Sequence, residues 1–116
     1  MRPRRAGRTD TGPTEVTTPD CHVVVERTPD LVVRAAGQLD HLSGPLLLAC
    51  AACRVSQRPV LDLTGVEFLD AGGLAALAHL ARESPAGSRL RLRCGTRRAV
   101  LHPLRITGLI DQFDLV

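Results

Sequence analysis

The segment FLDAGGLAALAHLAR at residues 68–82 places an acidic side chain directly before a run of small residues. Asp70 is followed by Ala71, Gly72 and Gly73, and then by a helical run rich in alanine and leucine. An aspartate at the start of a helix accepts hydrogen bonds from its first free amides and opposes the positive end of its dipole. The small side chains leave a surface of backbone that a protein or an anion can approach closely. A helix disfavours glycine by about 1 kcal/mol relative to alanine, so the two glycines need an explanation. Tight packing of the helix against the sheet explains them as well as a binding surface does.

The other reactive residues do not form a catalytic set. The chain has no lysine, so the glycines cannot belong to a P-loop. No serine or cysteine has a histidine and an acidic residue at a recognisable spacing, although a catalytic triad can also assemble from distant positions. We therefore expect a protein that is not an enzyme and that needs no cofactor.

Cys50 and Cys53 form a Cys-x-x-Cys pair inside an apolar run, toward the end of the helix expected there. Reactive pairs of this kind lie at helix N-termini, where the dipole lowers the thiol pKa, so buried structural thiols are expected. A thiol switch through Cys50, Cys53 or Cys94 remains an alternative. Zinc would require these three cysteines and a histidine to converge without the paired spacing of structural zinc sites, so no metal is expected.

Arg89, Arg91 and Arg93 alternate with apolar residues and predict a strand with one charged, solvent-exposed face. Charge on such a face prevents aggregation through strand edges. Nucleic-acid binding would use these arginines and the basic N-terminus. However, the chain beyond that terminus is close to neutral and only 2% of the residues are aromatic. We expect no direct contact with nucleic acid.

The chain of 116 residues suits one small domain. Residues 1–19 are dominated by arginine, threonine, proline and glycine, which predicts a disordered arm, with the domain over residues 20–116. The longest apolar run, at residues 46–53, is too short to cross a bilayer, and no apolar stretch follows the basic start as in a signal peptide. These features predict a cytoplasmic protein with reduced thiols and no membrane insertion.

The elements that position these residues follow from the hydrophobic pattern. β-branched runs at residues 21–26 and 31–36, separated by a turn, predict a hairpin. An apolar run at residues 43–54 predicts a helix with Ser43 as N-cap. A buried strand is predicted at residues 58–63, followed by a helix that starts at Asp70 and stops at residues 84–87. The inner face of this helix is predicted to carry Leu74, Leu77, Ala78 and Ala81. A strand at residues 89–94, a helix at residues 97–107 that contains Pro103 and ends at Gly108, and a short strand at residues 113–116 complete the chain.

This alternation of strands and helices predicts an α/β fold. We expect a single domain with an N-terminal β-hairpin and a mixed, largely parallel sheet of four to five strands, packed against about three to four helices.

Three segments resemble the signature of STAS domains, the anti-sigma factor antagonist family. The segment VLDLTGVEFLDAGGL at residues 60–74 is similar to the family's strand, Asp-Leu-Ser/Thr-Gly-Val, hydrophobic pair and Asp-Ser-Ser/Thr-Gly-Leu. Residues 37–41 resemble its Gly-x-Leu-Asp stretch, and residues 104–109 its closing Leu-x-x-x-Gly-Leu. The segments occur in the family's order, and the resemblance covers residues 21–116.

The resemblance implies a bacterial regulator of transcription that works by partner switching. Members of the family bind an anti-sigma factor that is also a GHKL-type serine kinase, and this binding releases a sigma factor. Phosphorylation of the serine that follows the aspartate of the motif reverses the binding. The partner-binding positions implied in this sequence are Asp40, His41, Ser43, Asp70, Ala71, Gly72, Gly73 and Leu74.

The phosphoacceptor position departs from the family's pattern. It is Ala71 here, and the next hydroxyl position is Gly72. A phosphoserine carries about −1.5 to −2 charge, which beside Asp70 would oppose binding. Because alanine cannot be phosphorylated, we predict an antagonist that is not switched at the usual site. Ser43 and Thr64 carry nearby hydroxyls, for which capping and turn roles are expected.

Two alternatives remain open within the same fold. One is a STAS accessory subunit of a membrane transport complex of the ABC type, and the other is a thiol-regulated STAS protein. No small-molecule ligand is expected for any of the three.

Overall fold

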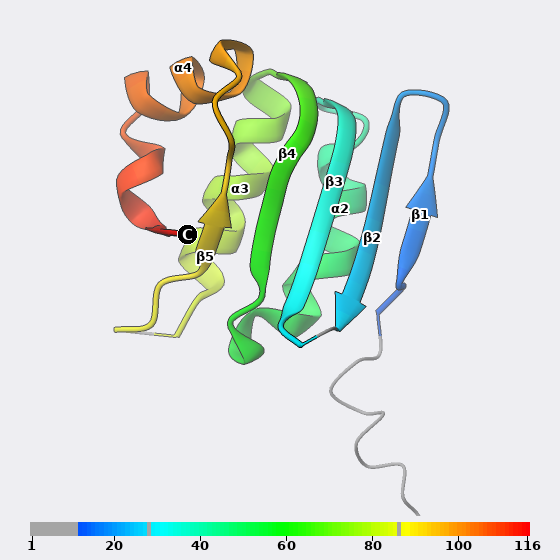
Figure 1. Cartoon of the computed structure of the whole chain (residues 1–116), viewed down its shortest axis with the longest axis vertical. Helices are drawn as coiled ribbons and strands as arrows, with labels where there is room; N and C mark the ends of the chain where they lie inside the picture. The colour runs from blue at the N-terminus through cyan, green and yellow to red at the C-terminus, as the bar shows by residue number, and fades with distance from the viewer. Residues whose placement is uncertain (1–11, 28, 86) are drawn as a thin grey trace, which may run out of the picture.

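The computed structural model describes residues 12–27, 29–85 and 87–116. Figure 1 shows one sheet with α2 and α3 behind it and α4 at its upper left. The elements in chain order are β1 Glu15–Thr17, β2 Cys21–Arg27, β3 Leu31–Leu39, α2 Gly44–Ala51, the 3₁₀ helix η2 Ala52–Gln57, β4 Val60–Leu69, α3 Ala71–Glu83, β5 Arg91–Arg93, α4 Arg98–Ile106, the 3₁₀ helix η3 Leu109–Gln112 and β6 Asp114–Leu115.

The six strands form one sheet in the order β1-β2-β3-β4-β5-β6. β2 pairs antiparallel with both β1 and β3, whereas β3, β4, β5 and β6 are parallel to one another. The predicted α/β architecture, with its N-terminal hairpin and largely parallel sheet, is confirmed. Within the described residues the sheet has six strands, one more than the upper limit of the prediction, and the strand that was not predicted is β1.

β1 lies within the segment that was predicted to be disordered, so the prediction is wrong for residues 15–17. Val16 packs against the core, and the side chain of Glu15 lies 2.8 Å from that of His22 on β2. The buried guanidinium of Arg54 donates hydrogen bonds to the backbone oxygens of Gly12 and Pro13 just before the strand. These long-range contacts are invisible in a local reading of composition. Residues 1–11 lie outside the described residues, and the expectation for them stays a prediction.

β4 is longer than the predicted strand at residues 58–63. It continues to Leu69 because two register shifts in its pairing with β3 absorb the irregular stretch around Gly65. The last pair joins Leu39 to Leu69, so β3 and β4 end side by side. This alignment brings the residues that follow each strand together at one edge of the sheet.

The helices follow the predicted order with local differences. Ser43 occupies the N-cap position of α2, as predicted, but its side chain makes no capping hydrogen bond. The helix turns into η2 at Ala52. α4 ends before Gly108, which has a positive φ, as predicted. None of the helices in residues 12–27, 29–85 and 87–116 is long and apolar enough to span a membrane.

The inner face of α3 is rotated from the predicted one. Of the four residues predicted to face inward, only Leu77 is fully buried, and the other three lie at the margin of the core. The buried positions of α3 are Gly73, Ala76, Leu77 and Leu80. Two of these are small, so the start of α3 can approach the sheet closely.

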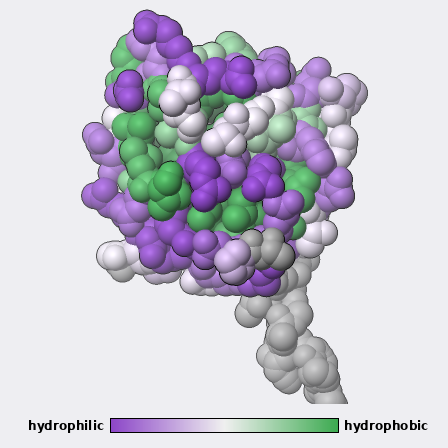
Figure 2. All heavy atoms as spheres, in the orientation of Figure 1, coloured by the Kyte–Doolittle hydropathy of each residue, from purple (hydrophilic) through white to green (hydrophobic). Residues whose placement is uncertain are grey.

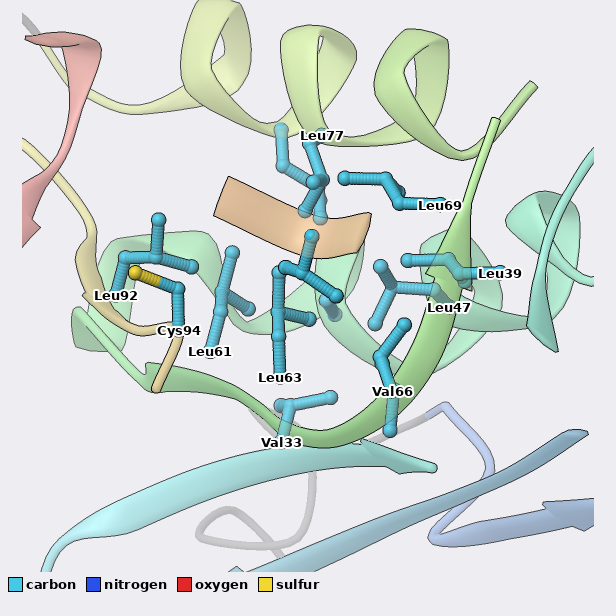
Figure 3. Close-up of a cluster of buried hydrophobic side chains, with 14 of the residues drawn as sticks. Val33, Leu39, Leu47, Leu61, Leu63, Val66, Leu69, Leu77, Leu92 and Cys94 are labelled. Atoms are coloured by element: carbon cyan, nitrogen blue, oxygen red, sulfur yellow. The ribbon is translucent and has the colours of Figure 1, made fainter. Parts of the chain in front are cut away.

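The core lies between the sheet and the helices. Figure 3 shows Leu61 and Leu63 of β4 and Leu92 of β5 extending between the sheet and α3, where they meet Leu77. Leucine and valine supply most of this volume, because the chain is nearly free of aromatic residues. Burial of these side chains is the main stabilising contribution.

No helix of the described residues covers the opposite face of the sheet (Figure 1). Hydrophilic residues occupy its middle, with hydrophobic residues around them (Figure 2). A row of ion pairs crosses four strands here: Arg34 contacts Glu26 and lies 3.3 Å from Asp62, which lies 3.4 Å from Arg93. Arg93 was expected on an exposed, charged strand face, and the structure pairs it with the buried Asp62.

Candidate partner-binding surface

Two segments that are distant in the sequence meet at the carboxyl ends of β3 and β4. The amide of Asp70 donates a hydrogen bond to the Leu39 oxygen at 3.2 Å. The loop at residues 40–43 therefore lies against the start of α3. We call the exposed part of residues 40–45 and 68–76 the rim.

Asp70 is the N-cap of α3, as predicted. Its Oδ1 accepts hydrogen bonds from the amides of Gly72 at 2.8 Å and Gly73 at 3.2 Å, with the Asp70 backbone extended. These bonds satisfy two of the amides that every helix start leaves free. The first turn contains no acidic residue besides this cap.

Gly72 and Gly73 face the 39–41 backbone rather than solvent. A Cβ on Gly72 would lie 2.4 Å from the backbone of His41, and one on Gly73 would lie 2.3 Å from the Leu39 oxygen. The structure thus supports tight packing as the reason for both glycines. Their absent side chains let the loop close on the helix, and Ala71 and the loop itself form the exposed part of the rim.

Asp40 organises the loop. Its Oδ1 accepts hydrogen bonds from the amides of Leu42 at 2.9 Å and Ser43 at 3.0 Å. The Ser43 amide bond is the largest influence on this carboxyl, and together these bonds hold the pKa of Asp40 below its usual value. The Ser43 hydroxyl is buried, donates to the Gln38 oxygen at 2.7 Å and accepts from the Asp40 amide at 2.9 Å. Ser43 therefore supports the loop from beneath and does not reach the rim.

Exposed apolar residues flank this loop and helix start. Leu42 is 72% exposed and Phe68 is 46% exposed, and Ala71 is exposed as the first residue of α3. Large apolar side chains that are exposed to water and bordered by polar residues are typical of binding surfaces. Sequence patterning did not single out Leu42 or Phe68, since their exposure depends on how the two strands end.

A groove of about 420 Å³ continues from the rim between α2 and α3. Its floor consists of small and apolar residues, and basic side chains stand along it. His41 and Gly72 of this set were predicted as partner-binding positions, and for the α3 residues a spacing of three and four among small side chains was the available signal. The lining residues are His41, Gly44, Pro45, Leu48, Gly72, Ala75, Ala76, His79 and Arg82.

The cysteines do not form a site. Cys50 is buried, as expected, and Cys94 is buried as well; burial raises the pKa of both thiols, so they resist ionisation. Cys53 is exposed, contrary to expectation, and its sulfur lies 3.6 Å from Arg54. Within the described part of the chain, no three histidine, cysteine or acidic residues lie together as a metal site would require.

Comparison with known proteins agrees with this architecture. A family profile described as "Mlab, STAS domain" matches residues 23–116. The crystal structure of an anti-sigma factor antagonist from Mycobacterium paratuberculosis superposes with a TM-score of 0.72 at 28% sequence identity, covering 86% of this chain and 89% of that one. No curated protein sequence matches the chain. The profile spans most of the chain and the fold agrees with it, so the chain belongs to the STAS domain family.

Proposed function

We propose that the protein is an anti-sigma factor antagonist. It binds an anti-sigma factor of the GHKL serine kinase type through the rim and thereby releases a sigma factor. In this proposal it acts in the bacterial cytoplasm, where sigma factors meet RNA polymerase, and it carries out no catalysis. Support comes from the likeness to the mycobacterial antagonist and from the exposed apolar residues Leu42 and Phe68 beside Asp40 and Asp70.

The rim carries no hydroxyl that a kinase can reach at the usual position, and this observation supports an antagonist that is not switched. Ala71 occupies the first turn of α3, where it is exposed. Gly72 cannot be replaced by a hydroxyl residue without a clash with His41. The Ser43 hydroxyl is buried, and the Thr64 hydroxyl donates to Asp62 at 2.6 Å. Binding therefore persists in the presence of ATP, and the amount of protein sets the response.

Phosphorylation assays with Ala71→Ser test this proposal. The unaltered protein and the variant are incubated with candidate anti-sigma kinases and ATP, and phosphate is located by mass spectrometry. We expect phosphate only on the introduced serine of the variant, followed by loss of its complex with the kinase, because the added charge lies next to Asp70. Stoichiometric phosphate on the unaltered chain would contradict an unswitched antagonist.

The surface is tested separately with Asp70→Arg. This variant places a positive charge at the rim, and we expect affinity for the anti-sigma factor to fall by about tenfold or more, since one such contact is worth about 1.4 kcal/mol. Asp111→Arg makes the same charge change on η3, outside the rim, and serves as the matched control. An equal loss of affinity in both variants would show that the rim is not part of the interface.

Binding to a transport ATPase in place of the anti-sigma factor would favour the accessory-subunit alternative.

A further inference from the structure

The solvent-facing side of α4 combines basic and apolar residues and is not part of the rim. We call this set the α4 outer face. It presents a basic ridge with an apolar residue on either side, and Ile106 is 71% exposed. Its members are Arg98, Ala99, Leu101, His102, Arg105 and Ile106.

Within the part of the chain that the structure describes, the charge of the α4 outer face is not balanced by acidic side chains. The sequence contains no acidic residue between positions 84 and 110. Arg91 and Arg93 of this segment pair with acidic residues elsewhere in the fold. In contrast, Arg98 and Arg105 make no ion pair or side-chain hydrogen bond with any residue in the ranges that the structure describes.

The arrangement of these charges disfavours the helix. Arg98 is the first residue of α4, which has no acidic residue in its first turn and no side-chain cap. A cation there faces the positive end of the helix dipole. His102 lies four residues after Arg98 and three before Arg105, so the basic side chains share one side of the helix and repel one another when the histidine is protonated. Such local conflicts with stability occur where a surface serves binding.

A hollow of about 200 Å³ lies on this face, lined by Thr96, Arg98, Leu101, His102 and Arg105. Two guanidinium groups, an imidazole and a hydroxyl around one hollow provide donors for a carboxylate. Leu101 and Ile106 provide apolar contacts on either side. Nucleic acid would exploit the charge but not these aliphatic side chains, and the face offers no aromatic ring for base stacking.

We infer that the α4 outer face binds an acidic segment of a partner protein, with glutamate or aspartate on Arg98 and Arg105 and an apolar residue against Leu101 or Ile106. The inference goes beyond the proposed antagonist function, because it concerns a second surface and does not depend on what binds the rim. A chain with both surfaces joins two proteins.

The electrostatic conflict is tested by thermal unfolding at low salt. Arg98→Glu should raise the melting temperature by about 2–5 °C, because the new carboxylate lies at the positive end of the helix dipole and the repulsion among the basic side chains of this face is reduced. Arg82→Glu is the matched control: Arg82 lies in the last turn of α3, where a cation is favourable, so the same change should lower the melting temperature. Both shifts should disappear in about 1 M salt. A lower melting temperature for Arg98→Glu would overturn the inference.

Binding is tested on the full chain with a short synthetic peptide of glutamate and leucine, a glutamine analogue of it, and a single-stranded oligothymidine. In ¹H–¹⁵N spectra the acidic peptide should shift the amide signals of residues 96–106 and leave those of residues 40–44 and 70–76 unchanged. The neutral analogue should have no effect.

The double variant Arg98→Ala with Arg105→Ala should bind the peptide about tenfold or more weakly, whereas Arg82→Ala should bind it as the unaltered protein does. Absence of peptide binding, shifts located elsewhere, or tighter binding of the oligonucleotide would each overturn the inference. The rim is assayed separately by Asp70→Arg, so either surface can fail without the other.

Discussion

At the scale of single residues, a glycine of α3 is required by the backbone of another segment. The local preference of a helix favours alanine over glycine at position 72 by about 1 kcal/mol. The contact with His41 opposes it, because a Cβ would lie 2.4 Å from that backbone, closer than atoms pack. The backbone of His41 cannot yield as the end of a flexible side chain can, so the steric term is the larger one.

Gly72→Ala is therefore expected to destabilise the protein by about 1–3 kcal/mol, the range for overpacking. Urea unfolding measures this difference. Ala71→Ser is the control on the exposed neighbouring position and should change the free energy of unfolding by less than about 0.5 kcal/mol. A Gly72→Ala variant as stable as the unaltered protein would show that the 39–43 loop moves away freely, and the geometry of the rim would then need revision.

At the scale of elements, the open face of the sheet is held by a carboxylate that is shared between strands. Asp62 of β4 is buried and accepts hydrogen bonds from the amide and hydroxyl of Thr64, with Arg34 and Arg93 on the neighbouring strands. Burial by itself raises the pKa of this carboxyl, but the hydrogen bonds from Thr64 and Arg34 outweigh it and lower the pKa below its ordinary value of 3.8. The carboxylate thus links three strands in its charged form.

Because the pKa of Asp62 is lower in the folded state, its contribution to stability is complete above pH 3.8 and is lost as the pH falls below that value. Asp62→Asn should cost about 2 kcal/mol near neutral pH, the scale for hydrogen bonds to a charged group, and should make stability fall less steeply with acid. Thermal unfolding from neutral pH down to about pH 2.5 measures both effects. The control is Asp30→Asn, which removes the exposed pair with Arg91 at 3.7 Å and should have little effect. If the stability of Asp62→Asn fell with acid as steeply as that of the unaltered protein, this role of Asp62 would be disproved.

At the scale of the whole molecule, one buried arginine joins the N-terminal strand to the helical layer. Arg54 of η2 is completely buried and donates to the oxygens of Gly12, Pro13 and Cys50. The first two contacts join residues that are 42 and 41 positions apart in the sequence, and they fix the entry to β1. β1 forms one edge of the sheet, so this contact also covers the edge of β2.

Arg54→Met keeps much of the length of the side chain and removes its donors. We expect a loss of about 2–3 kcal/mol, because three backbone carbonyl groups lose hydrogen bonds to a charged partner. Amide hydrogen exchange should become faster in residues 14–25. In α3 and β4 it should become faster only by the amount that the loss of global stability accounts for. Arg58→Gln, which removes the exposed pair with Asp114 at 2.9 Å, is the control and should leave exchange in β1 unchanged. Unchanged protection of β1 in Arg54→Met would show that pairing with β2 suffices to hold it.

The type and order of the elements could be predicted from the sequence, because periodicity and turn residues act over a few positions. The hairpin, the central strand, the cap at Asp70 and the end of α4 before Gly108 all follow from such local signals. Predictions failed where contacts outside the local pattern decide. The Ser43 side chain makes no capping hydrogen bond because its oxygen accepts from the Asp40 amide instead. β1 forms because Arg54 and β2 hold it.

By itself, the sequence determined the fold class, the family motif around Asp70 and the absence of a hydroxyl at position 71, since these depend on residue type and spacing. Only the tertiary structure decided that Gly72 and Gly73 face the 39–41 backbone, that Leu42 and Phe68 are exposed beside them, and that α4 carries unbalanced charge. Close approach, exposure and charge balance depend on which distant atoms become neighbours, and a local pattern along the chain does not encode these distances.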